Sequence, residues 1–248
     1  MNTKFFPVLL TIIGFLSMSL IIRHDVADQK YIELAKKYPQ TCHLADGEGT
    51  LIKENWVLTA AHAAIVLQDQ MENGRIPEVI VQNKKYKVKK VKLHPEFAIS
   101  ETGVHHDIAL IQIDGFVKDV PIAKLYSKKD EKGKLITVVG RGDFGTGLTG
   151  PQKGDKITRA GTNKIDGTNK HYVYFTFDGP GSENVTPLEG ISGPGDSGGP
   201  AFIDEDGERY IIGVSSHQAS DEQEGIYGVI EFYTRVSAYK KWIEENMK

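Results

Sequence analysis

The sequence contains a single cysteine, Cys42, so the chain cannot close an internal disulfide. It also lacks a strong charge of either sign, because 30 basic and 33 acidic residues leave a formal net charge of −3. This balance gives no electrostatic basis for binding nucleic acid or an anionic membrane surface. The sequence shows no repeat of fixed period and no low-complexity tract. With 248 residues, the chain is long enough to fold around its own hydrophobic core without cross-links.

A long apolar run occurs only at the N-terminus. Lys4 precedes an apolar stretch over residues 5–22, which contains the small residues Ser17 and Ser19. This order is typical of a secretory signal peptide, which we place at residues 1–20. An uncleaved anchor is the alternative, since about 18 apolar residues barely span a bilayer. The signal predicts a secreted or periplasmic protein that has no membrane contact once the signal is removed.

The densest basic segment is NKKYKVKKVKLHP, residues 83–95. Its lysines alternate with apolar residues, which is typical of a strand with one solvated face, and the alternation slips midway as it does at a β-bulge. A polyanion-binding site is the alternative that such a run leaves open. We expect a solvated strand.

Most of the remaining chain consists of short segments rich in Val, Ile, Tyr and Phe, separated by Gly, Asn or Asp. Such segments at this spacing indicate an all-β sandwich or barrels. Apolar residues at helical spacing predict one helix over residues 236–248 and a weaker candidate that begins at Asp28. The Gly- and Lys-rich segment 140–170 is predicted to form surface loops.

The segment GPGDSGGPAF, residues 193–202, places Asp196 and Ser197 among four glycines. These residue types suit a tight turn between two strands. They equally suit a nucleophilic serine held where backbone N–H groups can bind an oxyanion. GDSGG also fits the G-x-S-x-G pattern of α/β-hydrolase esterases, but that fold requires alternating strands and helices around the serine.

A nucleophilic serine needs a base to take its proton and a third group to orient that base. His62 follows an apolar strand in NWVLTAAHAA, and Asp107 begins another apolar strand in HHDIALIQI. Taken singly, each residue also fits a structural role, the first as a half-buried histidine and the second as a strand-end cap.

Taken together, WVLTAAH, DIALI and GDSGGP resemble the three signature segments of the trypsin/chymotrypsin-like serine peptidases, in the same order along the chain. The resemblance extends from about Ile21 to Trp242. It implies two six-stranded antiparallel β-barrels, the first over about 21–125 and the second, with the C-terminal helix, over about 126–248. The catalytic groups would lie in the cleft between the barrels.

The resemblance also implies residue roles. Ser197 would be the nucleophile, His62 the general base, and Asp107 the carboxylate that fixes its tautomer. The N–H groups of Gly195 and Ser197 would form the oxyanion hole, and Ser216 would hydrogen-bond the triad aspartate. No cofactor is implied.

No metal site is predicted. His105 and His106 precede Asp107, but neighbouring residues on a strand point to opposite faces of the sheet.

In the family, the aspartate beside the nucleophile pairs with the ammonium group of a newly freed N-terminal residue, usually isoleucine. The resemblance assigns these positions to Asp196 and Ile21. Arg23 and His24 stand where the family usually has two glycines.

The family's specificity pocket has its floor six positions before the nucleophile, which here is Ile191. His217 and Gln218 stand at wall positions, and Glu231 aligns near another. If Glu231 points into the pocket, the enzyme would prefer a basic residue before the cut, whereas if it points away, Ile191 indicates an apolar or small one.

The sequence therefore predicts an exported serine endopeptidase that acts as a monomer on protein or peptide substrates, through an acyl-enzyme intermediate and without a nucleic-acid partner. The alternatives are a catalytically silent pseudo-peptidase that serves as a binding module and a serine esterase.

Overall fold

The computed structural model describes residues 20–100, 103–152, 154–219 and 223–248. The expected signal peptide at 1–20 lies outside the described residues except for Leu20. Within the described part of the chain, no helix is long and apolar enough to cross a membrane.

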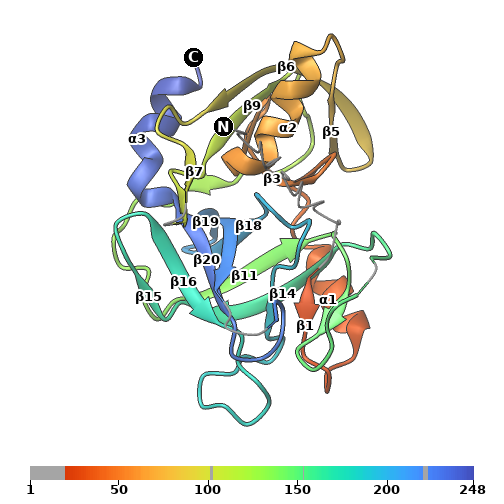
Figure 1. Cartoon of the computed structure of the whole chain (residues 1–248), viewed down its shortest axis with the longest axis vertical. Helices are drawn as coiled ribbons and strands as arrows, with labels where there is room; N and C mark the ends of the chain where they lie inside the picture. Colours follow the sequence, from red (N-terminus) through yellow and green to blue (C-terminus); the bar gives the residue numbers. More distant parts are fainter. Residues whose placement is uncertain (1–19, 101–102, 153, 220–222) are drawn as a thin grey trace, which may run out of the picture.

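The first half of the chain forms a closed barrel of six strands (Figure 1). The pairing order around the barrel is β2 (Thr41–Leu44), β3 (Gly47–Lys53), β4 (Trp56–Thr59), β9 (Ala109–Ile113), β6 (Lys84–Leu93) and β5 (Glu78–Val81). The lysine-rich segment is the solvated strand β6, and its pairing with β9 shifts register between Val88 and Lys90. The strand and its predicted bulge are both confirmed.

One helix lies between two strands of the first barrel in the sequence, and the sequence pattern did not predict it. Helix α2 (Ala61–Glu72) begins directly after β4 and buries Ala61, Ala64 and Leu67 against the barrel. Its first turns are mostly alanine, so a clear apolar stripe is missing although alanine favours helix strongly.

The second half of the chain forms an antiparallel sheet that wraps around its own core. Its pairing order is β14 (Arg159–Lys164), β11 (Leu135–Gly140), β18 (Pro200–Glu205), β19 (Glu208–Ala219), β20 (Ile230–Arg235), β16 (Tyr172–Thr176) and β15 (Gly167–Thr168), with the short β10 (Lys124–Leu125) beside β19. The predicted fold is confirmed, although this half is an open sheet rather than a closed six-stranded barrel.

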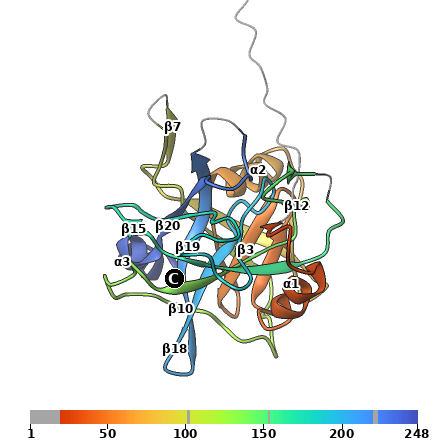
Figure 2. The same ribbon diagram turned by 90° about the horizontal axis from the view of Figure 1, so that it is seen from below.

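A small sheet joins the start of the described chain to loops of the second half. Strand β1 (Ile21–Ile22) lies between β12 (Gly145–Thr146) and β17 (Gly190–Ile191), and β13 (Gly150–Pro151) flanks β12. The first described strand therefore packs among loops of the second half, although it precedes the first barrel in the sequence. A separate hairpin, β7 (Ala98–Ser100) and β8 (Gly103–His105), stands out from the body of the molecule (Figure 2).

The two remaining helices match the predicted ones. Helix α1 (Asp28–Ala35) packs against β14, and α3 (Val236–Asn246) packs against β19 and β10 (Figure 1). The buried residues of α3 belong to a core cluster that also contains Trp56 and Leu58 of β4 and Val139 of β11. This cluster joins the two halves, so the residues between them are held by a continuous core.

Candidate active site

The fold brings His62, Asp107 and Ser197 to the junction of the two halves from three different elements. His62 is the second residue of α2, and Asp107 lies two residues before the start of β9. β4 and β9 are paired, with Thr59 opposite Ala109, so the residues just beyond these strand ends lie close together. Ser197 lies in the turn between β17 and β18, in the second half.

Asp107 holds the His62 ring and backbone at once. Its Oδ2 lies 2.7 Å from Nδ1 of His62, and its Oδ1 accepts the amide N–H of His62 at 3.0 Å. Burial alone would raise the pKa of Asp107, but the charge and hydrogen bonds of His62 and a hydrogen bond from Ser216 lower the pKa below its ordinary value. The carboxylate is therefore ionised near neutral pH. With Nδ1 bound to the carboxylate, Nε2 of His62 is left to accept a proton.

Ser216 completes the environment of the carboxylate. Its Oγ donates to Oδ2 of Asp107 at 2.6 Å, and Oγ1 of Thr234 donates to the backbone carbonyl of Asp107 at 2.8 Å. The side chain of Asp107 is fully buried. A buried carboxylate with all its neighbours fixed in this way has little freedom to turn away from His62.

Replacing Ser216 with alanine is expected to lower kcat/KM about 10–100-fold, because a hydrogen bond to a charged group contributes roughly 1.5–3 kcal/mol. The lost donor also raises the pKa of Asp107, so the variant should lose additional activity at acidic pH, where Asp107 becomes protonated. Ser237→Ala is a matched control, since it removes a hydrogen bond of the same 2.6 Å length from the buried Glu131. Equal rates and pH profiles for Ser216→Ala and the wild type would contradict this role.

The loop around Ser197 has a backbone that only glycine adopts readily. Gly195 has φ of +92° and Gly198 has φ of +81°. A Cβ at Gly198 would also lie 2.1 Å from Oγ1 of Thr59. The carbonyl of Ser197 accepts the amide N–H of Glu48 at 2.8 Å, which ties the loop to β3.

Two amides of this loop are available to a ligand, whereas those of Asp196, Gly198 and Gly199 donate to backbone carbonyls. Among the described residues, the N–H groups of Gly195 and Ser197 donate no hydrogen bond within the protein, and Oγ of Ser197 makes none to His62. Two unpaired amides beside a serine hydroxyl can bind a developing oxyanion.

Asp196 is fully buried between two loops of the second half. Its carboxylate accepts the amide N–H of Gly142 at 3.0 Å and that of Gly193 at 3.0 Å. Burial raises the pKa of Asp196 well above its usual range. The predicted ion pair with Ile21 needs a free ammonium group at Ile21, which a chain that keeps Leu20 does not have.

Glu231 points inward and is almost completely buried, with 1% of its surface exposed. Its carboxylate accepts hydrogen bonds from Oγ of Ser192, from Oγ of Ser215 at 3.4 Å and from Nε2 of Gln218 at 2.7 Å. Burial raises the pKa of Glu231 to about 8. These partners are all neutral, so the carboxylate lacks a compensating cation among the described residues.

The other two predicted pocket residues lie in different surroundings. Ile191 is fully buried in the core of the second half and pairs with Ile21 in the small sheet. His217 stacks on Phe232, with ring centres 4.9 Å apart, and meets the edge of Tyr172 at 5.1 Å. The structure therefore joins Gln218 with Glu231, and it places the Ile191 side chain in the hydrophobic core of the second half.

A family model and curated relatives identify the protein's class. The model of the family described as Trypsin matches residues 35–243. The chain belongs to the trypsin family. It is a serine-type endopeptidase with the trypsin fold, and the α/β-hydrolase esterase alternative does not fit its antiparallel sheets.

Three relatives illustrate the similarity of this trypsin-family chain to known peptidases. The chain is 28% identical over 217 residues to "Trypsin 5G1" of Aedes aegypti, covering 79% of this chain and 73% of that protein. It is 28% identical over 215 residues to "Trypsin" of Phaedon cochleariae, covering 79% and 77%. It is 28% identical over 209 residues to "Transmembrane protease serine 11B" of Homo sapiens, covering 78% of this chain but 48% of that protein.

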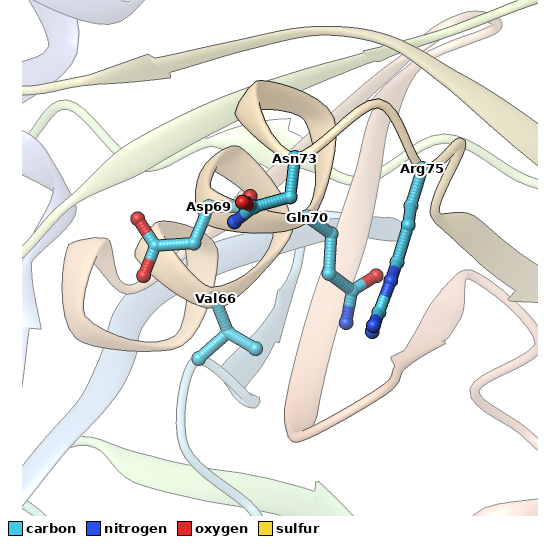
Figure 3. Close-up of a pocket in the computed structure, with 5 residues that line it drawn as sticks. All are labelled: Val66, Asp69, Gln70, Asn73 and Arg75. Carbon is cyan, nitrogen blue, oxygen red and sulfur yellow. The ribbon is translucent and has the colours of Figure 1, made fainter.

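A surface hollow on α2 contains none of His62, Asp107 and Ser197. It has a volume of about 450 Å³ and is lined by Val66, Asp69, Gln70, Asn73 and Arg75 (Figure 3). In this view the Asp69 carboxylate points away from the side chains of Gln70 and Arg75. A single carboxylate is too few for a calcium site, and none of the lining residues belongs to the triad.

Of the three partners of Glu231, the sequence predicted Gln218 as a pocket residue but did not reveal Ser192 and Ser215. Ser192 and Ser215 each stand next to a residue that was considered, Ile191 and Ser216, and only that adjacency signalled them. Tyr172 and Phe232 gave no signal, because aromatic residues on strands occur throughout a β-protein core.

Proposed function

We propose that the protein is an exported serine endopeptidase whose triad is His62, Asp107 and Ser197. The observation that carries the proposal is the buried Asp107 carboxylate, 2.7 Å from Nδ1 of His62 and fixed by Ser216. The glycine-rich loop with the two free amides of Gly195 and Ser197 supports it.

The chemistry follows from these groups. Oγ of Ser197 attacks the substrate carbonyl while Nε2 of His62 takes the hydroxyl proton, and the amides of Gly195 and Ser197 bind the oxyanion. His62 then gives its proton to the leaving amine, which leaves an acyl-enzyme. Water hydrolyses the acyl-enzyme by the same proton transfers in reverse, and no cofactor is required.

The reaction class is tested with quenched peptides whose scissile bond lies away from both ends. We expect a monomer in solution that cuts such peptides internally, with no change on adding nucleic acid. Hydrolysis of simple esters without any peptide cleavage by the processed protein would contradict the proposal. Peptide binding without any hydrolysis, as expected of a silent binding module, would contradict it too.

We further propose that Glu231 makes the enzyme prefer Lys or Arg before the cut. A buried carboxylate that has only neutral partners gains strongly from a substrate cation. Gln218 supports this by holding Glu231 and also donating to the carbonyl of Ser192 at 2.6 Å. The basic preference is therefore favoured over the apolar one that Ile191 alone indicated.

We propose that cleavage during export leaves Ile21 as the N-terminal residue. Its ammonium group would then form an ion pair with the carboxylate of Asp196. β1 lies between the loops that bind the Asp196 carboxylate, because Ile21 pairs with Gly145 and with Ile191. The two amides that bind Asp196, those of Gly142 and Gly193, lie within three residues of these partners. A new N-terminus at Ile21 would therefore start beside the buried carboxylate and supply the cation that it lacks.

A chain that begins at Ile21 is expected to have kcat/KM about 100-fold above that of a chain that keeps Leu20 and the preceding residues. The reason is that an unpaired buried charge costs roughly 3–5 kcal/mol, which opposes the ordered nucleophile loop. The two forms are made from a fusion protein by cutting at different residues and compared with one substrate. When both forms also carry Asp196→Asn, they should be equally slow. Equal rates for the two forms with Asp196 intact would contradict the pairing.

A further inference from the structure

A cluster of His94, Glu96 and His106 lies at the base of the β7–β8 hairpin, outside the triad. One ring nitrogen of each histidine and one carboxylate oxygen of Glu96 all lie within 4.8 Å of one another. His94 and Glu96 belong to the turn after β6, and His106 joins β8 to β9. The three residues come from the two ends of the hairpin, which the chain brings together.

The ring of His106 is held in a fixed orientation. Its Nδ1 lies 3.1 Å from the hydroxyl of Tyr239, and the same hydroxyl lies 2.8 Å from Nδ1 of His171. Nε2 of His106 is directed to the other side and lies 3.9 Å from Oε2 of Glu96. A ligating histidine typically has its second nitrogen engaged in this way, which sets the ring for the metal.

His94 and Glu96 complete the cluster. The rings of His94 and His106 are stacked with centres 4.9 Å apart and 11° between their planes. Nδ1 of His94 accepts the amide N–H of Glu96 at 3.2 Å, at the long end of the range for such a hydrogen bond. The Glu96 side chain is 72% exposed, so it can move to close the site and leaves an entry path.

We propose that this cluster is a binding site for a divalent transition-metal ion of the Zn²⁺ class. Two imidazole nitrogens and one carboxylate oxygen are ligands that zinc accepts, whereas Ca²⁺ and Mg²⁺ require mainly oxygen ligands. Ligand atoms on one tetrahedral zinc are about 3.3 Å apart. The three candidate atoms lie within 4.8 Å of one another, and Oε2 of Glu96 is already 3.9 Å from Nε2 of His106, so binding an ion requires the three side chains to close in on it. Water would fill the remaining coordination position.

The site is separate from the catalytic groups although His106 precedes Asp107. The His106 ring contacts His94, Tyr239 and His171, whereas the Asp107 carboxylate contacts His62 and Ser216. An ion here would tie the two ends of the hairpin together and hold the backbone where Asp107 begins. His106 has φ of +48°, so a ligand that holds this residue also holds a backbone conformation that non-glycine residues rarely adopt.

The sequence expectation of no metal site rested on neighbouring residues pointing apart, and that argument holds for His105. The His105 ring lies on the other side, 3.2 Å from Oγ of Ser100. The sequence could not show that His106 would instead meet His94, twelve positions earlier in the chain.

The test is calorimetric titration of ZnCl₂ into the full chain carrying Ser197→Ala, which prevents self-digestion. We expect one Zn²⁺ per chain and no binding of Ca²⁺ or Mg²⁺. His94→Gln and His106→Gln should remove the binding, and Glu96→Gln should weaken it at least tenfold. Because Glu96 is exposed, its replacement leaves the fold intact even if a histidine variant does not fold. His105→Gln is the matched control and should bind as tightly as the parent.

Tyr239, whose hydroxyl lies 3.1 Å from Nδ1 of His106, provides a second test of the site. Tyr239→Phe should weaken Zn²⁺ binding about 10–100-fold, as expected for loss of a group that orients a ligand. Zn²⁺ should also raise the thermal midpoint of the parent and of His105→Gln, but not that of Glu96→Gln. Absence of Zn²⁺ binding, or equal affinity in the parent and in Glu96→Gln, would overturn the proposal.

Discussion

Replacing Ser197 with alanine is expected to reduce kcat/KM by about 10⁴–10⁶ while leaving the fold unchanged. Alanine removes the attacking oxygen but keeps the backbone amide that would bind the oxyanion. Ser197 is a partly exposed residue whose loop is held by backbone hydrogen bonds, such as that from Glu48 to its carbonyl, which the substitution preserves. The measurement is the rate of peptide hydrolysis by the processed protein, with the thermal midpoint recorded in parallel.

The three residues of the proposed triad act in one step, so the effects of their substitutions on the activation free energy should not be additive. His62→Ala should cost about as much as Ser197→Ala, and the double variant should be scarcely slower than either single one. A double variant slower by the product of the two single effects would show that the residues act independently. A wild-type rate in Ser197→Ala would place the nucleophile elsewhere.

Replacing Glu231 with glutamine is expected to lower kcat/KM for Lys and Arg substrates about 100-fold or more, because the substrate cation would then be buried without a partner. Glutamine has nearly the same shape and keeps hydrogen bonding to Ser192, so apolar substrates should change only a few-fold. Glu189→Gln is a matched control, since Glu189 is also buried and is bound by Thr186 through its amide and its hydroxyl.

Because Glu231 titrates, the expected preference for Lys or Arg before the cut should depend on pH. With the pKa raised to about 8, the carboxyl is mostly protonated at pH 7 and ionised at pH 9. Binding a cation requires the ionised form, so KM for Lys substrates should fall as pH rises through 8, and KM for apolar substrates should not. An apolar preference in the wild type, or a KM for Lys that does not vary between pH 7 and 9, would contradict this assignment.

Much of the fold was predictable because strands carry a period that is local in sequence. The alternation in β6 predicted both the strand and its bulge, confirmed by the register shift between Val88 and Lys90. Helix α2 escaped prediction because its alanines do not separate a buried face from an exposed one. The open second sheet escaped because closure depends on pairing between distant strands.

The candidate triad was predictable from ordered motifs, and the pocket was not. The direction of a side chain on a strand reverses with a shift of one residue. Strand β19 shifts register against β20 between Ser215 and His217, directly before the pocket residues. The sequence alone could therefore not decide on which face of β20 Glu231 lies, whereas in the structure its carboxylate is buried against Ser192, Ser215 and Gln218.

The most direct test of the proposed mechanism is a fluorophosphonate reaction followed by peptide mass spectrometry. The chain processed at Ile21 should take up one phosphonyl group, on Ser197, and the Ser197→Ala variant should take up none. Labelling of a different residue, or no labelling of a correctly processed and folded chain, would contradict the assignment of Ser197 as the nucleophile.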